Sequence, residues 1–444
     1  MRLFGTNGVR GIVNEDMTAE FARKMGTAIG KFMCGTVAIA SDTRTSADMI
    51  KSAVSAGLMA AGCNILDAGV IPTPALQYYV KRNKIKGGVM ITASHNPPQF
   101  NGIKCIGSDG TETARKDEER IEYLFFNPKD DTSSPGRMEH ISGVAEEYID
   151  GVVSHVDAEA IRKAKLSVVL DCANGAAFAT SPLLMKRLGV KAVTLNADPQ
   201  GEFPGHLSEP TEENLGDLVA LVKHTHADAG IAHDGDADRT VFVTDAGEFV
   251  QGDPGLALMA AYEMKRKKGI AVVPVNTSSA VEEVVKKAGG TVTYTAVGSP
   301  IVAREMIRSN AVFGGEGNGG FIFSEHQFCR DGAMAAAKML ESIAKNGKLS
   351  EQLKTIPKYC MFKIKFECPN EKKEALLESL EKSIKEEKNT TDGLKVIFKD
   401  GWVSLRPSGT EPIFRIYSES KDEGTAKERT ESFKTMALEA LSKL

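Results

Sequence analysis

A unit of apolar strand, polar break, helix and second strand occurs three times in this sequence and restricts it to an α/β architecture. In the first copy, the apolar run 36–40 is followed by polar residues 41–46, a helical segment that ends at Gly62, and a second apolar run, 63–68. The polar break supplies helix N-caps and the glycine a helix C-cap. Two strands joined by a helix in this way predict a βαβ unit.

Two further copies of the unit begin at the apolar runs 166–171 and 269–275, each followed by a polar break and a helical segment that ends in glycine. Because more than a hundred residues separate the copies, they indicate separate α/β domains rather than a solenoid of short repeats. A chain of 444 residues has room for about three domains of about 150 residues each.

The C-terminal part of the chain has a different pattern. Residues 362–366 alternate between apolar and charged side chains, which is typical of a half-exposed strand. Further elements are expected as strands at 394–398, 402–405 and 413–417, a charged helix from Glu371 to about Glu387, and an amphipathic helix from Lys421 to Leu444. Strands grouped between two helices favour an α+β domain with one antiparallel sheet.

The predicted fold is therefore three tandem α/β domains, with mixed sheets flanked by helices, followed by a C-terminal α+β domain. The expected domains are residues 1–148, 149–248, 249–355 and 356–444. A hinge is expected near 355–358, because both the pattern and the fold class change there.

Charge and cysteine content exclude several classes of protein. The net charge of −4 gives no bulk electrostatic reason to bind nucleic acid. The seven cysteines are odd in number and form no C-x-x-C pair, so neither a zinc site nor a disulfide framework is indicated, and a reducing cytosol is favoured. The N-terminus lacks the apolar core of a signal peptide, and no apolar run approaches the ~20 residues that cross a bilayer. We expect a cytoplasmic protein with neither nucleic acid nor membrane as partner, and we predict no oligomeric state.

Four polar loops carry the chemistry that this scaffold can support. Residues 92–98 follow a run typical of a buried strand, so the hydroxyl of Ser94 is presented at a fixed point. The other loops are 234–239, 315–319 and 406–412. Together they supply a nucleophile, a cation site, a reader of hydroxyl groups and an anion clamp. This set indicates an enzyme that moves phosphate on a polyhydroxylated substrate.

Asp234, Asp236 and Asp238 alternate along the second loop, which places three carboxylates on one side of an extended segment. A calcium loop would need Gly at its sixth position and Glu at its twelfth, where this chain has Arg239 and Asp245. Three hard oxygen ligands with room for a phosphate oxygen suit Mg²⁺ instead, and the ion would cancel charge on a phosphoryl group in transit.

The third loop matches a dinucleotide fingerprint in form, from Gly315 to Gly320, but apolar runs lie on both sides of it. That pattern predicts a strand, a turn and a strand, whereas the fingerprint needs a strand and then a helix. We interpret the loop as a hairpin tip that carries Glu316 and Asn318.

The fourth loop, with Arg415 shortly after it, combines two guanidinium groups, two hydroxyls and backbone N–H groups, a set that matches a phosphate dianion. The alternative is a simple turn between strands, where Pro and Gly are common. The residues of this phosphate clamp are Arg406, Ser408, Gly409, Thr410 and Arg415.

Taken together, the S-H-N-P, D-x-D-x-D-R and R-x-S-G-T-E-P loops, with residues 4–11, resemble the α-D-phosphohexomutase superfamily over essentially the whole chain. The resemblance implies three α/β domains and a fourth domain around a central cleft. It implies that Ser94 is carried as phosphoserine and donates its phosphoryl group to a substrate hydroxyl. The resulting hexose 1,6-bisphosphate then returns its other phosphate to Ser94, and the same bisphosphate is the expected primer for phosphorylating Ser94.

The resemblance also assigns roles to individual residues. One Mg²⁺ per chain is expected on Ser94, Asp234, Asp236 and Asp238. Arg10 and Arg239 correspond to active-site arginines, and Lys104 is expected beside Ser94, where it assists proton or charge movement. His95 is either catalytic or orients the loop. Glu316 and Asn318 are expected to bind sugar hydroxyls.

The preferred hexose is the least constrained part of the prediction. The clamp, with Arg415 three residues after Pro412, resembles phosphoglucosamine mutases, and the sugar loop resembles archaeal members. Asn318 replaces the commoner Ser, and Gly320 stands where many members have His, which leaves sugar preference open. The leading hypothesis is interconversion of glucosamine 6-phosphate and glucosamine 1-phosphate, and the alternative is a phosphomannomutase/phosphoglucomutase.

Two other classes of protein explain less of the sequence. A phosphatase that uses an Asp of the 234–238 loop as nucleophile leaves the Ser94 and Arg406 loops without a role. A non-catalytic sugar-phosphate sensor would not need both a serine nucleophile and a complete metal loop.

Overall fold

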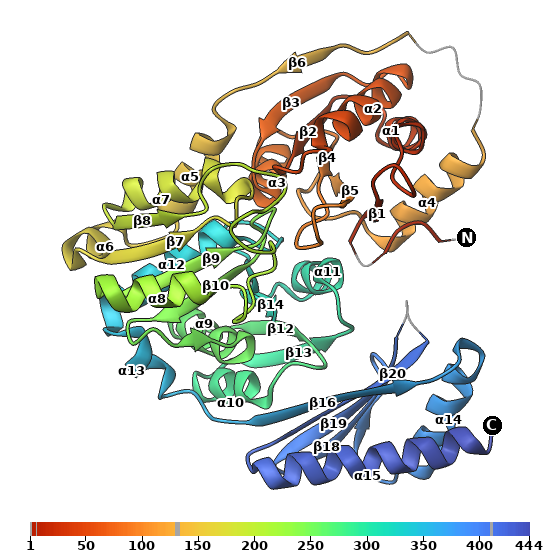
Figure 1. Cartoon of the computed structure of the whole chain (residues 1–444), viewed down its shortest axis with the longest axis vertical. Coiled ribbons are helices and arrows are strands. Elements are labelled where there is room, and N and C mark those ends of the chain that lie inside the picture. The colour runs from red at the N-terminus through yellow and green to blue at the C-terminus, as the bar shows by residue number, and fades with distance from the viewer. Residues whose placement is uncertain (1, 6, 129–133, 409–411) are drawn as a thin grey trace.

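The computed structural model describes residues 2–5, 7–128, 134–408 and 412–444. These residues form four sheets that follow one another along the chain, each with its own helices (Figure 1). None of the helices in these ranges is both long and apolar enough to cross a bilayer.

The first domain is built on a six-stranded mixed sheet with the order β1-β5-β4-β2-β3-β6. Central strands β2 and β4 are buried along their whole length, since helices cover both faces of the sheet. In chain order the elements are β1 (Val9–Ile12), α1 (Ala19–Met33), β2 (Val37–Ser41), α2 (Ala47–Ala60), β3 (Ile65–Val70), α3 (Thr73–Arg82), β4 (Gly87–Ile91), β5 (Phe100–Gly107), α4 (Arg115–Phe126) and β6 (Met138–His140).

The second domain has a five-stranded mixed sheet with the order β11-β10-β9-β7-β8. Between the first strand and the main helix of its βαβ unit the chain forms a short 3₁₀ helix, η1. The elements are α5 (Val144–Ser154), α6 (Ala158–Ala164), β7 (Ser167–Asp171), η1 (Ala176–Ala179), α7 (Ser181–Leu188), β8 (Lys191–Leu195), α8 (Gly216–Thr225), β9 (Ala229–His233), β10 (Thr240–Thr244) and β11 (Phe249–Val250).

The third domain has a four-stranded mixed sheet with the order β13-β12-β14-β15. Its elements are α9 (Gly252–Arg266), β12 (Ile270–Pro274), α10 (Ser279–Lys287), β13 (Thr291–Thr295), α11 (Ser299–Ser309), β14 (Phe313–Glu316), β15 (Gly320–Phe323), α12 (Gly332–Asn346) and α13 (Leu349–Leu353). The strand pairs β2/β3, β7/β8 and β12/β13 are all parallel, which confirms the three predicted βαβ units.

The fourth domain is α+β, as predicted, because every strand pair in its sheet is antiparallel and two helices accompany it. Its elements are β16 (Cys360–Glu367), η2 (Asn370–Lys372), α14 (Lys373–Ser383), β17 (Lys388–Asn389), β18 (Leu394–Phe398), β19 (Gly401–Pro407), β20 (Ile413–Ser420) and α15 (Glu423–Ser442). The charged helix α14 ends earlier than predicted, since Ile384 turns into an extended conformation and is buried in the domain core.

The hydrophobic cores show how the domains are joined. One cluster of buried side chains continues through the first three domains, whereas the fourth has a core of its own. Polar contacts connect the fourth domain to the third: the Ser279 N–H donates to Glu419 at 2.9 Å, and the Val297 N–H donates to Asp392 at 2.9 Å. The exact domain boundaries inferred from the sequence stay predictions.

Candidate active site

The loop after β4 holds Ser94 in a conformation that costs free energy. Ser94 is fully buried and has a φ of +54°, in the left-handed region that non-glycine residues rarely adopt. Such strain costs about 1–3 kcal/mol and persists only where the surroundings fix the backbone. The Thr92 hydroxyl accepts the Ser94 N–H at 2.8 Å, and is itself held by Asp42, to which it donates at 2.6 Å.

A buried arginine fixes the rest of this loop. The guanidinium of Arg44 pairs with Asp42 at 3.1 Å, and neither side chain is exposed. It also donates to four backbone carbonyls, those of Ser94 (2.9 Å), Asn96 (2.6 Å), Pro97 (2.7 Å) and Phe100 (2.8 Å). The strained turn is thus tied to the first βαβ unit by charge-assisted hydrogen bonds.

The aspartate loop joins β9 to β10 and lies directly against the Ser94 loop. The three carboxylates of Asp234, Asp236 and Asp238 are buried and offer oxygens within 4.8 Å of one another. The Ser94 hydroxyl donates to Asp234 at 2.8 Å. The two loops approach so closely that a Cβ at Gly235 would lie 2.5 Å from the Ser94 carbonyl oxygen, so glycine is required there.

Two cations and a hydroxyl group from other elements bind the carboxylates. Lys104, on β5, lies 2.5 Å from Asp236 and 3.3 Å from Asp238. The Thr73 hydroxyl donates to Asp236 at 2.5 Å, and Arg330 donates to Asp238 at 2.6 Å. The ammonium group of Lys104 thus lies at two of the three aspartates, and the role expected for it beside Ser94 stays a prediction.

The donor set fits a divalent cation. One oxygen each of Asp236 and Asp238 (Oδ1 in both) is buried and has no hydrogen-bond partner among the described residues. Burial, with the charges of Asp238 and Asp236, raises the pKa of Asp234 to about 8. Burial would also raise the pKa of Asp236, but the charge and hydrogen bond of Lys104, together with the other groups around this carboxylate, outweigh burial and hold that pKa well below its usual range. Clustered hard oxygen donors that lack partners are the ligands Mg²⁺ prefers.

Two further arginines and a histidine surround Ser94. Arg10 donates to the Asn96 side chain at 2.6 Å, and Arg239 lies 3.9 Å from Asp234. The His95 Nδ1 lies 3.3 Å from the Ser94 hydroxyl. Burial, reinforced by the charges of Arg239 and Arg10, lowers the pKa of His95 to about 2, so this imidazole is neutral beside the hydroxyl.

The glycine-rich loop is a hairpin, because β14 and β15 pair antiparallel with Glu316 opposite Gly320. The Gly298 N–H donates to Glu316 at 3.2 Å, and Asn318 accepts the Gly320 N–H at 3.2 Å. Glu316 and Asn318 line a cavity of about 230 Å³, whose wall includes Lys363 and Tyr417 of the fourth domain. The dinucleotide reading is excluded, since a strand and not a helix follows the loop.

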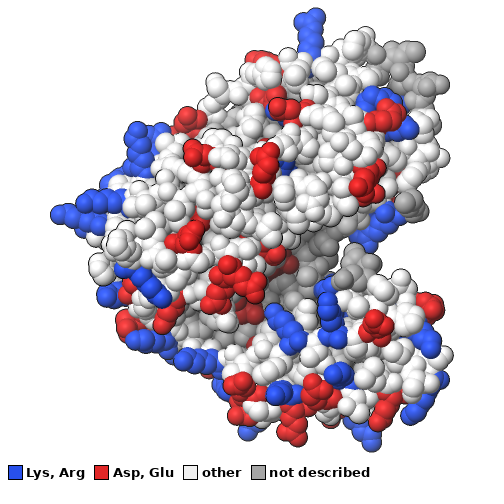
Figure 2. All heavy atoms as spheres, in the orientation of Figure 1, with Lys and Arg blue, Asp and Glu red and all other residues white. Residues whose placement is uncertain are grey.

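Two residues of the predicted phosphate clamp, Arg406 and Arg415, lie on β19 and β20 of the fourth domain. Arg406 and Arg415 are opposite each other in the register, so their side chains extend from the same face of the sheet. Arg406 donates to Asp392 at 3.0 Å, and Arg415 donates to Ser408 at 3.4 Å. Gly409 and Thr410 lie outside the described residues. Figure 2 shows a cleft between the three-domain body and the C-terminal domain, with Lys and Arg side chains on the C-terminal side.

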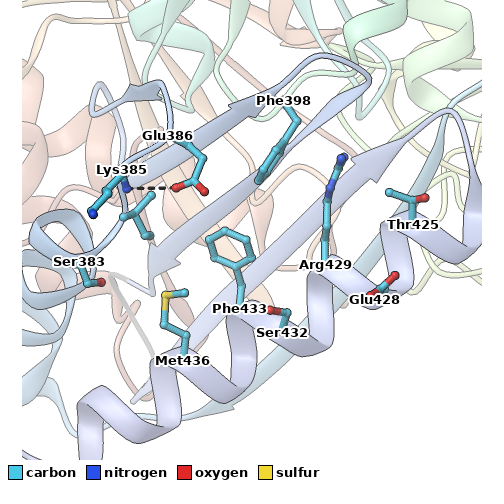
Figure 3. Close-up of a pocket in the computed structure, with 11 residues that line it drawn as sticks. Ser383, Lys385, Glu386, Phe398, Thr425, Glu428, Arg429, Ser432, Phe433 and Met436 are labelled. Carbon is cyan, nitrogen blue, oxygen red and sulfur yellow. Dashed lines mark hydrogen bonds between the residues drawn. The ribbon is translucent and has the colours of Figure 1, made fainter.

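A second cavity, of about 500 Å³, lies within the fourth domain and contains none of the predicted site residues (Figure 3). Phe398 and Phe433 form its apolar wall, and Lys385, Glu386 and Arg429 lie at its edge. Size alone therefore does not mark the site. The candidate site is identified instead by buried carboxylates, cations and a strained serine that lie close together.

Family sequence models match the chain domain by domain. They describe phosphoglucomutase/phosphomannomutase α/β/α domains I, II and III and the C-terminal domain, and they match residues 1–131, 146–247, 251–359 and 364–435. The chain belongs to the phosphoglucomutase/phosphomannomutase family.

Members of this phosphohexomutase family from several organisms resemble the chain over nearly its full length. A phosphoglucomutase/phosphomannomutase of Thermococcus kodakarensis is 42% identical over 442 residues, or 97% of each chain. A probable phosphoglucosamine mutase of Methanopyrus kandleri is 40% identical over 445 residues, or 97% of each chain. The crystal structure of a phosphoglucomutase/phosphomannomutase family protein from Burkholderia thailandensis superposes with a TM-score of 0.88 at 27% identity, covering 98% of this chain and 97% of its own.

Sequence reasoning missed three side chains of this phosphohexomutase that contact the site: Arg44, Thr73 and Arg330. The sequence pattern of the polar break 41–46 predicts only helix caps. In the structure Ser46 makes no side-chain capping bond to α2, and Arg44 holds the Ser94 loop instead. An aspartate two residues before an arginine, directly after a buried strand, is the signal that could have found this pair.

Proposed function

We propose that the protein is a phosphohexomutase that interconverts glucosamine 6-phosphate and glucosamine 1-phosphate through a phosphoserine at Ser94 and a hexosamine 1,6-bisphosphate. The observation that carries the proposal is the buried, strained Ser94, whose hydroxyl is 2.8 Å from Asp234 in a three-carboxylate loop. A serine carrier allows phosphate to move between two hydroxyls of one sugar that cannot exchange it directly.

In the first half-reaction, a hydroxyl oxygen of the sugar phosphate forms a bond to the phosphorus on Ser94 while the Oγ–P bond breaks. The sugar hydroxyl loses its proton and Ser94 Oγ gains one, so a bisphosphate and a free serine result. In the second, the bisphosphate has turned over, and Ser94 Oγ forms a bond to the phosphorus of its other phosphate while the bond from that phosphorus to the sugar oxygen breaks. The proton leaves Ser94 Oγ and the sugar oxygen gains one, so a sugar monophosphate and phosphoserine result. Lys104, Arg10 and Arg239 are proposed to balance the charge of the transferred phosphoryl group. Lys104 contacts Asp236, Arg10 donates to Asn96, and Arg239 lies 3.9 Å from Asp234, which supports this role.

Asp234, Asp236 and Asp238, with the oxygen on Ser94, are the proposed ligands of one Mg²⁺, which when bound supplies positive charge next to the phosphoryl group. A hexose 1,6-bisphosphate is the proposed primer, because it can phosphorylate a free Ser94 and leave a monophosphate. Glu316 and Asn318 are proposed to bind sugar hydroxyls, and the clamp residues of the fourth domain to hold the phosphate that is not reacting.

The substrate is proposed from family likeness and from the clamp. The relative from Methanopyrus kandleri is named a probable phosphoglucosamine mutase, which supports the amino sugar, whereas the relative from Thermococcus kodakarensis, named a phosphoglucomutase/phosphomannomutase, supports the alternative. The partners proposed are small sugar phosphates. A cytosolic location is proposed because all seven cysteines are free thiols.

Comparing sugars tests this function directly. We expect the purified protein, with Mg²⁺ and a trace of hexose 1,6-bisphosphate, to convert glucosamine 6-phosphate with a higher kcat/KM than mannose or glucose 6-phosphate. Conversion can be followed by ³¹P NMR, which separates the 1- and 6-phosphates. A higher kcat/KM on mannose or glucose 6-phosphate would favour the alternative, and release of inorganic phosphate alone would contradict a mutase.

We expect Arg406→Ala to lower kcat/KM by a similar factor on all three sugar phosphates, because every candidate substrate carries the phosphate it grips. A charge-assisted contact worth roughly 1.5–3 kcal/mol implies a loss of about 10- to 150-fold. Asn318→Ser is the contrasting variant, and should change the ratio of rates between the sugars. If Arg406→Ala instead affected the sugars differently and Asn318→Ser affected them equally, the roles of the two residues in binding phosphate and binding sugar hydroxyls would have to be exchanged.

We expect Arg44→Lys to lower kcat by about tenfold or more with little change in KM. A single ammonium cannot replace a guanidinium that binds four carbonyls, and losing one contact of about 1.5 kcal/mol already gives a tenfold effect. Arg23→Lys, at an arginine whose side chain is 47% exposed on α1, is the matched control. If Arg44→Lys folds and keeps the wild-type kcat, the Ser94 loop holds its conformation without the hydrogen bonds from Arg44.

A further inference from the structure

Arg330 lies buried between two loops to which sequence reasoning did not connect it. Its guanidinium donates through Nη2 to Asp238 at 2.6 Å and lies, through Nη1, 3.5 Å from Glu316. Its side chain is only 5% exposed, and those of Asp238 and Glu316 are 2% and 10% exposed. One side chain thus touches both the aspartate loop of the second domain and the sugar loop of the third.

The sugar hairpin leaves room for this arginine. Gly320 is the register partner of Glu316, and a Cβ built on Gly320 would overlap the Cδ of Arg330. The φ of Gly320 is not in the left-handed region, so backbone conformation does not require glycine there. The Arg330 side chain fills the space that any larger residue at position 320 would need.

The backbone that carries Arg330 is fixed independently of the site. The neighbouring Asp331 donates its N–H to the Phe321 carbonyl at 2.9 Å and caps α12 by accepting the Met334 N–H at 2.9 Å. The Tyr148 hydroxyl and the Gln327 amide also donate to Asp331, at 2.5 Å and 2.7 Å. The backbone at Arg330 is therefore held in place, and its guanidinium group is oriented before any ligand binds.

We propose that Arg330 is a positioning residue which couples the metal loop to the sugar loop and so contributes to sugar specificity. Arg330 orients the Glu316 carboxylate and at the same time offsets the charge of Asp238. Gly320 has no side chain and so leaves the space that Arg330 occupies. This inference rests on the proposed mutase function. A substitution at Arg330 should therefore change the response to the sugar and the response to Mg²⁺ together.

Two double-mutant cycles test the coupling, with kcat, KM and the Mg²⁺ concentration for half-maximal rate measured on glucosamine, glucose and mannose 6-phosphates. In the first cycle, Arg330→Lys is combined with Glu316→Gln. Lysine keeps one positive charge but lacks the fork that reaches two carboxylates. We expect Arg330→Lys to raise KM about fivefold or more, to change the ratio of rates between sugars and to shift the Mg²⁺ response. In the Glu316→Gln background, its effect on KM should fall below about twofold.

In the second cycle, Gly320→Ala is made alone and with Arg330→Ala. We expect Gly320→Ala to lower kcat/KM about tenfold in the wild type, because the new methyl group displaces Arg330, and less than about twofold when Arg330 is already alanine. Melting temperatures measured alongside identify variants that are merely unfolded. The Arg330→Lys cycle remains informative if Gly320→Ala fails to fold.

The outcomes separate the inference from the proposed function. If Glu316→Gln changes KM but both cycles are additive, the coupling is wrong and the mutase assignment stands. If Arg330→Lys lowers only the melting temperature, with the sugar ratio and the Mg²⁺ response unchanged, Arg330 is structural and the inference fails. If Glu316→Gln leaves all three sugars unaffected, the sugar-loop assignment fails and the inference fails with it.

Discussion

Ser94→Ala is expected to reduce mutase turnover below detection while binding of glucosamine 6-phosphate stays within a few-fold of the wild type. The substitution removes only the oxygen that carries the phosphoryl group, so the half-reactions have no acceptor. The clamp, Glu316 and Asn318 remain to bind the sugar phosphate. Coupled-assay kinetics measure the turnover, and isothermal titration calorimetry measures the binding.

Mass spectrometry provides the matching test on the unmodified enzyme. After incubation with hexose 1,6-bisphosphate, the wild type should gain one phosphate that maps to Ser94, and Ser94→Ala should gain none. Ser208→Ala is the matched control, because its buried hydroxyl makes one hydrogen bond to the described residues, a long one of 3.5 Å to the Ser94 carbonyl. We expect it to keep most of its turnover and its phosphorylation. Wild-type activity in Ser94→Ala would exclude the serine carrier altogether.

The repeating pattern predicted the domain architecture because strand and helix periodicity are local properties of the sequence. The parallel pairs β2/β3, β7/β8 and β12/β13, and the hairpin of β14 and β15, were all predicted from runs of apolar residues and the loops between them. The end of α14 was not predicted correctly, because Ile384 leaves the helix and packs in the core of the fourth domain. Tertiary burial overrode local propensity there.

The site was predictable where its chemistry is carried by loop motifs, and not where it depends on long-range contacts. Asp234 and its neighbours in the loop were identified because three alternating carboxylates are unusual. Arg44 binds carbonyls about fifty residues further along the chain, at Ser94 and beyond. Every residue has a backbone carbonyl, so the sequence does not indicate which of them Arg44 binds. Arg330 contacts Asp238 across 92 residues, and only the fold brings the two together.

Asp236→Asn is expected to weaken Mg²⁺ binding and mutase activity together, each by about 100-fold or more. The substitution removes one of three anionic ligands, and losses of 10- to 100-fold are already typical when only the residues that support metal ligands are changed. Chelation by EDTA should inactivate the wild type, and added Mg²⁺ should restore the activity. Half-maximal Mg²⁺ concentrations from activity and from binding isotherms check the two effects separately.

A measurement without turnover distinguishes loss of metal from loss of catalysis. A ligand that binds only the folded state stabilises it, by about 2.7 kcal/mol at a concentration 100 times its Kd. Mg²⁺ should therefore raise the melting temperature of the wild type and of Ser208→Ala, but not that of Asp236→Asn. The variant also leaves Lys104 with Asp238 as its remaining carboxylate partner in the site, so its own stability should fall even without Mg²⁺. If activity withstands EDTA and the melting temperature does not change with Mg²⁺, then Lys104, Arg330 and Arg239 neutralise the aspartates and no metal takes part.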